Sequence, residues 1–469
     1  MPRMLFVDDG DVAWIHNLTR VIHCARKQEG KPVVVPEHRW EEDPNGGPFL
    51  GGTVRLEPNR GYRMWYQSFV RSSMLSLYAE SADGIHWTRP ILGRHADWSG
   101  DWQNNILFSQ SALRPDSLSP YRTYHEHNHS VLFTPHLGPE RTYTLLSYDY
   151  GTSGCAAYHG FVLAFSPDGL LWTDASNEPV IPAHSDVGWF TFDEVDRKFR
   201  GIVRSANGQL HIRGNWRRPL LWTESWDGYE WLLPQPAILP DLRDEEWTQG
   251  RPGCHTQFYG MPIARYESLL LGLLQVFRVT RWGRNQDGEI DVQLACSRDG
   301  RQWSRVGDRR AILELGPEGA WDCGMVLTGN SLVRDGDRVR LYYTGWNISH
   351  EPVDNRNGQC RIGMAWWPRD RMVGLSARGQ IGELETKLHV AGARLHVNAD
   401  ATGGQVAAEI VGQDGWPIEG YRASDCEALS EDALDHTFRW RNPLSHLGGR
   451  PVAVRLRLAN AEAFSLWWD

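Results

Sequence analysis

A short segment, Ser-x-Asp-Gly-x-x-Trp, occurs four times in this chain and constrains its fold more than any other feature. Copies at intervals of about 60–85 residues indicate a repeat architecture in which each copy belongs to one supersecondary unit. Asp-Gly between two apolar runs is a strong hairpin signal, because both central positions of a type I′ turn need positive φ. We expect each copy to join the last two strands of a small sheet. The copies are residues 81–87, 166–172, 225–231 and 297–303.

Further β-prone runs precede each copy and complete a unit of four strands. In the first unit these runs are residues 52–56, 62–66 and 75–81. A fifth unit begins near residue 325 and has the same layout, but its final turn at 369–371 is degenerate. Five four-stranded units without a helical period between them predict a five-bladed β-propeller over residues 40–375. Ordinary hairpins stacked as a sandwich are the alternative, and five near-equal units argue against it.

The remaining parts of the 469-residue chain have a different sequence pattern. Residues 385–469 form short alternating runs separated by Gly, Asp and Pro turns, which predicts a C-terminal β-sandwich. Residues 1–39 are interpreted as an N-terminal lead-in segment that enters the first blade or contacts the sandwich. The 47 glycines and 23 tryptophans suit many short strands and turns, so the predicted fold is all-β throughout.

Charge and composition exclude several classes of function. The net charge is −9 and the Lys and Arg residues are scattered, which disfavours a nucleic-acid partner. No apolar run reaches the roughly 20 residues of a membrane span, and none near residue 1 has the length of a signal peptide. The seven cysteines contain no C-x-x-C pair, which is typical of reduced thiols. We therefore expect a cytoplasmic protein with no membrane contact.

Residues 42–46 read Glu-Asp-Pro-Asn-Gly, which looks like the Asn-Asp-Pro-Asn-Gly motif of glycoside hydrolase family 32. With the five units, their turns and the C-terminal strands, this segment makes the chain resemble the five-bladed propeller glycoside hydrolases of families 32, 43 and 68 and their uncharacterised relatives. The Arg-Asp-Pro and Glu-Cys motifs of family 32 are not found at the corresponding places. The resemblance implies that the opening strand of each blade lines a central funnel, with acidic catalytic residues at its entry.

Hydrolysis of a glycosidic bond needs two carboxyl groups, one protonated and one ionised. Several acids in one funnel can have separated pKa values, because burial and nearby like charges both favour keeping a proton. Among the polar residues that precede the opening strands, we predict Asp43, Asp186 and Asp322 as catalytic acids, with Glu41 and Glu126 beside them. The alternative for each is a turn carboxylate or strand-end cap, which is ordinary turn chemistry.

A sugar presents C–H faces that stack on aromatic rings and hydroxyls that bind polar side chains. Residues of both kinds precede or follow the expected strands at the funnel entry. For individual histidines and aromatic rings, a satisfied structural histidine and core packing are the alternatives. No spacing is diagnostic of zinc, so we predict no metal and no cofactor, although a structural calcium is compatible with such a propeller. The predicted substrate-binding residues are Glu41, Glu126, His127, His255, Gln257, Arg278, Trp346 and His350.

These features favour an exo-acting glycoside hydrolase that removes a furanoside, fructoside-like or arabinoside-like, or another small glycoside from an oligosaccharide. A second hypothesis is a glycosyltransferase of the fructan-forming type or a phosphorylase like those acting on mannosides. Arg204, Arg251 and Arg278 leave a phosphate site open. A third hypothesis is a non-catalytic carbohydrate-binding propeller, which calorimetry with a glycan panel would detect as binding without turnover.

Overall fold

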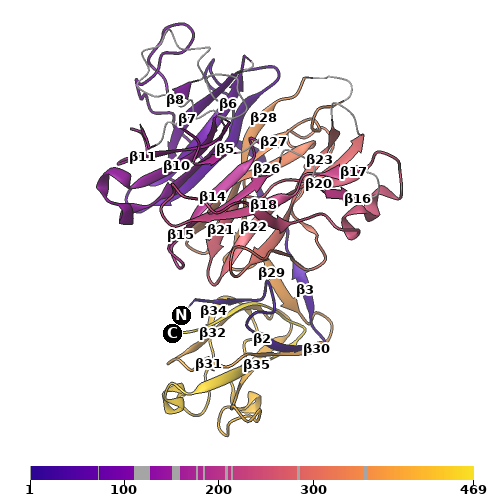
Figure 1. Cartoon of the computed structure of the whole chain (residues 1–469). Helices are drawn as coiled ribbons and strands as arrows, with labels where there is room; N and C mark the ends of the chain where they lie inside the picture. Colours follow the sequence, from indigo (N-terminus) through magenta and orange to yellow (C-terminus); the bar gives the residue numbers. More distant parts are fainter. Residues whose placement is uncertain are drawn as a thin grey trace.

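In the computed structural model of the chain, β-strands and short 3₁₀ helices make up the regular structure of the described residues (Figure 1). None of the helical segments in the described ranges has both the length and the apolar character needed to span a membrane. The structure describes residues 2–71, 73–109, 127–149, 159–175, 178–182, 185–205, 210–212, 215–281, 286–352 and 357–469.

Strands between residues 26 and 368 form five antiparallel groups, which we number along the chain. Group 1 holds β5 (Gly47–Glu57), β6 (Gly61–Val70), β7 (Ser73–Ser81) and β8 (Ile106–Ser109). Group 2 holds β9 (His127–Phe133), β10 (Tyr143–Asp149), β11 (Gly160–Ser166) and the short edges β12 (Thr173–Asp174) and β13 (Ile181–Pro182). Group 3 holds β14 (Gly188–Asp193), β15 (Lys198–Arg204), β18 (Leu220–Ser225) and β19 (Gln235–Ile238).

Groups 4 and 5 complete this series. In group 4, β20 (His255–Gly260) and β21 (Ile263–Tyr266) both pair with β22 (Leu269–Arg281), which pairs with β23 (Asp287–Ser297) and its edges β24 (Ser304–Arg305) and β25 (Ala311–Leu313). Group 5 holds β26 (Met325–Asp335), β27 (Arg338–Trp346), β28 (Cys360–Pro368) and β4 (Arg26–Val34). A separate hairpin joins β16 (Leu210–Ile212) and β17 (Asn215–Arg217).

The first strands of the five groups contact one another in order, where β20 and β21, which both pair with β22, together form the first strand of group 4. β5 lies against β9, β9 against β14, β14 against β21, β21 against β26, and β26 against β5. Residues from the later parts of β5, β9, β14 and β26, and from β21, which follows β20, line one small cavity of 150 Å³. β26 and β5 pair in parallel at Asn330 and Thr53, so these two strands run in the same direction. The starts of the first strands therefore lie at the end of the assembly opposite this cavity.

The four Ser-x-Asp-Gly-x-x-Trp segments form one kind of turn after the third strand of groups 1 to 4. In the first copy, Asp83 Oδ1 accepts hydrogen bonds from the backbone N–H groups of Ile85 at 2.8 Å and His86 at 2.9 Å. Gly84 has φ +74° and donates its N–H to Ser81 Oγ at 2.9 Å. The expected type I′ geometry is wrong, because only the Gly has positive φ. The carboxylate binds the turn amides, so the Asp can keep an ordinary backbone conformation.

These turns also fasten neighbouring groups to one another. In the group 2 turn, the carbonyl oxygens of Asp168 and Gly169 accept hydrogen bonds from Arg63 Nη2 and Trp65 Nε1 of group 1, both at 2.7 Å. A Cβ added to Gly169 would lie 2.8 Å from the Trp65 ring, so a side chain there would disturb the contact. The equivalent contacts elsewhere join Tyr342 to Gly84 and Arg200 to Asp299.

Two further sheets, whose strands are yellow, orange and indigo in Figure 1, share one hydrophobic core below the five groups. Leu395 and Leu466 of the first sheet meet Val406 and Leu456 of the second in that core. The first sheet holds β3 (Thr19–Ile22), β29 (Val373–Ser376), β36 (Glu462–Trp468), β32 (Leu395–Asp400), β34 (Asp432–Thr437) and β1 (Met4–Leu5). The second holds β2 (Val12–His16), β30 (Ile381–Thr386), β35 (Pro451–Ala459), β31 (His389–Val390) and β33 (Gln405–Val411).

The N-terminal strands connect the two parts of the molecule. β1, β2 and β3 pair with strands of the C-terminal sheets, whereas β4 pairs with β28 as the outer strand of group 5. Because β4 fills that place, the chain needs no fourth strand after β28, which explains the degenerate turn at residues 369–371. Asp370 instead ties the parts together, accepting hydrogen bonds from Tyr266 Oη at 2.6 Å and Ser465 Oγ at 2.8 Å.

Candidate functional site

Polar side chains from groups 3, 4 and 5 meet at the end of the assembly where the first strands begin. They lie just before β14, at the end of β15, before β18, along β20, before β23 and after β27. We call this set the mouth cluster. It consists of Asp186, Arg204, Arg218, His255, Gln257, Tyr259, Gln286 and His350.

The Asp186–Arg204 ion pair is the charged centre of the mouth cluster. Arg204 Nη2 lies 3.3 Å from Asp186 Oδ1, and Arg204 Nε donates to Ser185 Oγ at 3.1 Å. The Arg204 guanidinium also lies over the Tyr259 ring, 4.7 Å from its centroid. The Asp186 side chain keeps 29% of its surface exposed, against 8% for Arg204. Arg204 is thus held in place while the carboxylate remains accessible to a ligand.

Arg218 supplies a second positive charge beside this pair. Its Nε donates to Gln257 Oε1 and its Nη2 to Gln286 Oε1, both at 3.0 Å. Both acceptors are neutral, and within the described part of the chain no carboxylate lies within salt-bridge distance of Arg218. Burial, with the neighbouring Arg204 charge, lowers the pKa of Arg218 to about 10. The guanidinium therefore stays charged near neutral pH, and its charge is available to an anion or a sugar hydroxyl.

His255 orients the side chain that holds Arg218. Gln257 Nε2 donates to His255 Nε2 at 2.9 Å, so the His255 proton sits on Nδ1, which donates to the Gly253 carbonyl at 3.1 Å. Burial, reinforced by Arg217, lowers the pKa of His255 to about 4. The imidazole is therefore neutral over the physiological range, and its lone pair turns the Gln257 amide so that Oε1 faces Arg218.

His350 presents a second neutral imidazole. Its Nδ1 lies 3.0 Å from the backbone carbonyl oxygen of Gln286, which can only accept, so Nδ1 carries the proton. Burial lowers the pKa of His350 below its ordinary value. Its ring contacts those of Phe277 and Tyr259, with centroids 5.0 and 5.4 Å away. This tautomer leaves the Nε2 lone pair available to accept a hydrogen bond from a hydroxyl group.

Aromatic rings border these polar groups. Phe49, Tyr259 and Trp346 are partly buried and pack against a cluster that contains Phe277 and Met325. The three outer rings come from groups 1, 4 and 5. The predicted Trp346 thus lies among the aromatic rings beside the mouth cluster. The predicted residues His255, Gln257 and His350 are polar members of that cluster.

Asp322, although it precedes β26 as Asp186 precedes β14, has a different environment. Its Oδ2 accepts hydrogen bonds from Lys27 Nζ at 2.6 Å and from Tyr343 Oη at 3.0 Å. Only 3% of its side-chain surface is exposed. Burial, together with the Asp322 charge, raises the pKa of Tyr343. Asp322 therefore forms an interior ion pair with the outer strand of group 5.

Glu41 and Arg278 are also engaged away from the mouth cluster. Glu41 is buried and accepts hydrogen bonds from Tyr66 Oη at 2.5 Å and Arg89 Nε at 3.3 Å. Arg278 binds Asp291, with Nη1 2.6 Å from Oδ2. In β22, Arg278 follows Phe277, so its side chain lies on the opposite face of the sheet from that ring. Burial raises the pKa of Asp291 despite this pairing.

Asp43 lies in a separate pocket between groups 5 and 1. Its Oδ1 accepts from the backbone N–H of Asn45 at 2.8 Å and its Oδ2 from that of Arg71 at 2.7 Å. Oδ1 thus holds the loop that enters β5, and Oδ2 joins that loop to the β6–β7 turn. Of the remaining predicted residues, Glu126 lies outside the described residues, and His127 begins β9 with a side chain that is likewise outside them.

Three members of the mouth cluster were not predicted: Arg218, Tyr259 and Gln286. The Arg217-Arg218 pair directly before β18 is the one local signal that could have drawn attention to this loop. The two side chains diverge, since Arg217 Nη2 binds Glu245 at 2.9 Å. Among the described residues, no three His, Cys, Asp or Glu side chains are grouped to hold a metal ion.

No protein-family model and no curated protein sequence matches this chain. Several solved structures resemble it. An N-acetylgalactosamine deacetylase from F. plautii, in complex with blood group B trisaccharide, is 17% identical over 76% of this chain and 97% of that one, with a TM-score of 0.49. A glycosyl hydrolase from Bacteroides ovatus is 13% identical over 75% and 95%, with a TM-score of 0.48. A β-1,2-mannobiose phosphorylase from Listeria innocua is 11% identical over 74% and 97%, with a TM-score of 0.46.

Proposed function

We propose that this chain is a carbohydrate-active enzyme that cleaves a glycosidic bond at the mouth cluster. The observation that carries the proposal is the convergence of an accessible carboxylate, two guanidinium groups, a neutral imidazole and aromatic rings at one end of the five groups. Such a mixture of ring faces and convergent polar groups suits a sugar.

We also propose an architecture for this enzyme. The mutual contacts of the first strands favour the five-bladed β-propeller predicted over residues 40–375, with β28 as its last strand and β4, from the N-terminal segment, as the outer strand of the fifth blade. The two C-terminal sheets with a shared core favour the β-sandwich predicted over residues 385–469, extended by β29, β30 and the N-terminal strands β1, β2 and β3. In a propeller the mouth cluster would lie at one opening of the central channel.

In this mechanism Asp186 is the carboxylate that attacks the anomeric carbon or activates water. Arg204 holds the carboxylate in position, and His350 Nε2 accepts a hydrogen bond from a sugar hydroxyl. Asp149, a buried carboxyl at the end of β10, is our candidate for the proton donor to the leaving oxygen, because β10 ends at the same side of the molecule. The catalytic roles of Asp43 and Asp322 stay predictions.

The first experiment is a turnover assay of the purified protein with p-nitrophenyl glycosides, including arabinofuranosides and mannosides, and with fructo-oligosaccharides. We propose exo-acting hydrolysis of a small glycoside, so a single sugar should be released from the chain end. Calorimetric binding of one of these compounds with no release of product would contradict the proposal and support a non-catalytic binding protein.

Phosphorolysis is the second candidate, and a specific observation favours it. Arg204 and Arg218 place two positive charges beside one accessible carboxylate, and Arg218 is hydrogen-bonded only to neutral amides among the described residues. Arginine pairs of this kind suit a phosphate group. Turnover that requires inorganic phosphate and yields a sugar 1-phosphate would support phosphorolysis. Equal turnover in phosphate-free buffer would support hydrolysis.

A further inference from the structure

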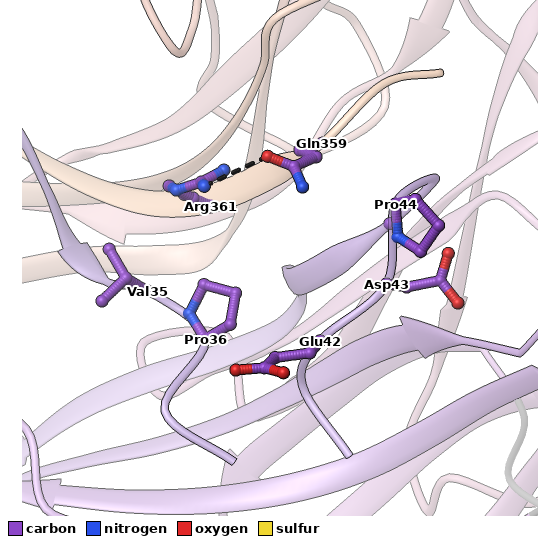
Figure 2. A pocket seen from close by; sticks show the side chains of 8 residues that line it. Val35, Pro36, Glu42, Asp43, Pro44, Gln359 and Arg361 are labelled. Carbon is purple, nitrogen blue, oxygen red and sulfur yellow. Dashed lines mark hydrogen bonds between the residues drawn. The ribbon is translucent and has the colours of Figure 1, made fainter. Parts of the chain in front are cut away.

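A pocket of 680 Å³ lies outside the mouth cluster (Figure 2). Its volume falls within the range of about 300–1,000 Å³ typical of small-molecule sites. The lining comes from the segment after β4, the loop before β5 and the start of β28. We call it the rim pocket, and its lining residues are Val35, Pro36, Glu42, Asp43, Pro44, Gly46, Gln359 and Arg361.

Hydrogen bonds hold the walls of the rim pocket in place. The Cys360 N–H donates to the Gly46 carbonyl at 3.0 Å, which joins β28 to the loop before β5. The Gln359 N–H donates to Asn347 Oδ1 at 2.8 Å. Asp43 binds two backbone amides of its own loop and of the β6–β7 turn. The pocket is therefore built from fixed backbone segments and needs little reorganisation to bind a ligand.

Side chains with unused hydrogen-bonding capacity face each other across this space. Figure 2 shows Arg361 and Gln359 on one side and Glu42 on the other, with proline rings between them. Arg361 Nη2 donates to Gln359 Oε1 at 3.2 Å, which uses one of its five N–H groups. Within the described part of the chain, Glu42 accepts no hydrogen bond and forms no ion pair with Arg361. A ligand with both donors and acceptors and an apolar face would satisfy these groups.

The rim pocket lies close to the mouth cluster. Cys360, between Gln359 and Arg361, is the cross-strand partner of Trp346. On the other wall, Gly46 precedes Phe49 by three residues, and Phe49 packs against the same hydrophobic cluster as Trp346. Strands lie about 4.8 Å apart and rise about 3.3 Å per residue, so the backbone segments that line the pocket begin roughly 5–10 Å from the backbone of Trp346 and Phe49. Neighbouring units of one oligosaccharide can bridge that separation.

From this arrangement we propose that the rim pocket binds a further sugar unit of an oligosaccharide whose reacting end occupies the mouth cluster. Arg361 and Gln359 donate to its hydroxyl oxygens, Glu42 accepts from its hydroxyl groups, and the proline rings contact its C–H face. The inference rests on the proposed function and narrows the substrate to a chain of several sugar units. Binding energy from such a remote unit appears in the KM of long substrates and is lost on truncated ones.

The test compares two substrates of the sugar that the turnover assay identifies, namely its p-nitrophenyl monosaccharide and its tetrasaccharide. Arg361→Gln and Glu42→Gln should each raise the KM for the tetrasaccharide about tenfold, as expected for one charged hydrogen bond. The KM for the monosaccharide should change much less. Arg60→Gln and Glu230→Gln replace exposed side chains outside this pocket and should leave both values unchanged.

Two results would overturn the inference. One is an equal change in KM on both substrates, and the other is no change on either. In both cases the wild-type enzyme would still turn over the glycoside, so the proposed function would stand without the rim pocket. Failure of the proposed function gives a different result, because no glycoside would then be cleaved by any of these proteins.

Discussion

Asp186 and Asp322 occupy matching places in two groups of the molecule and have opposite environments. Each lies two or three residues before the first strand of its group. The Asp186 side chain is 29% exposed and lies 3.3 Å from Arg204, whereas Asp322 is 3% exposed and lies 2.6 Å from Lys27. The difference arises from β4, which brings Lys27 to group 5 from the beginning of the chain. An acid before an opening strand is therefore a functional candidate only where no distant strand has already paired it.

The largest expected effect is on catalysis at Asp186. Asp186→Asn keeps the size of the side chain but removes the charge that the mechanism uses. Turnover should fall about 10²–10⁴-fold, the usual contribution of a positioned acid–base group. The thermal unfolding temperature should fall less than for Asp322→Asn, because the Asp186–Arg204 pair is longer, at 3.3 Å against 2.6 Å, and the Asp186 carboxylate is 29% exposed. The measurement is the initial rate on the glycoside identified in the turnover assay, and an unchanged rate would show that Asp186 does not act in the reaction.

Asp322→Asn should instead affect stability. The substitution leaves the Lys27 ammonium group without its buried partner, and breaking such a pair costs about 3–5 kcal/mol. Because the Lys27 side chain is 21% exposed, we expect a value near the lower end of that range. Calorimetric unfolding measures it. The double variant Lys27→Met with Asp322→Leu is the control and should recover stability. An Asp322→Asn protein that is fully stable but inactive would favour the catalytic role that the sequence pattern predicted.

The next effect is a pH dependence of stability at His255. Its pKa is lowered to about 4 in the folded protein, whereas an unfolded histidine titrates near 6.5. Between these values the unfolded chain binds more protons, so this group makes stability fall as the pH falls from about 6.5 to about 4. Unfolding temperatures between pH 7 and pH 4 should therefore decline more steeply for the wild type than for His255→Asn. Parallel declines would show that His255 is not protonated on unfolding.

Local sequence signals could predict the repeated turns and five members of the mouth cluster, one of which is Arg204 at the end of β15. Asp186, His255 and Gln257 lie at the starts of first strands, and His350 follows a strand end, so pattern alone places them at one end. Whether the other predicted residues belong to the site depends on partners that lie far away in the sequence. Glu41 has the same local signal, but its carboxylate is bound by Arg89, which lies 48 residues away in the sequence. The β4–β28 pairing joins residues more than 300 positions apart, and no sequence motif within either strand predicts this pairing.

Arg218 and Gln286 escaped prediction for a related reason. Each of them precedes a strand and belongs to no sequence motif. Their role depends on hydrogen bonds with residues that lie far away in the sequence. Arg218 binds Gln286 across 68 residues, and it reaches Gln257 across 39 residues. Side chains that bind each other from different groups share no local pattern. Sequence analysis therefore locates the end of the fold where the site lies more readily than the full set of side chains that meet there.

The smallest expected effect tests how Asp322 is held. Tyr343→Phe removes the hydroxyl group that donates to Asp322 Oδ2 at 3.0 Å and leaves the Lys27 ion pair in place. A single hydrogen bond contributes about 1 kcal/mol net, or somewhat more when its acceptor is charged. The loss should therefore be clearly smaller than that of Asp322→Asn, and turnover should stay close to that of the wild type. Equal losses of stability in the two variants would mean that the hydroxyl group, rather than Lys27, is the main partner of this carboxylate.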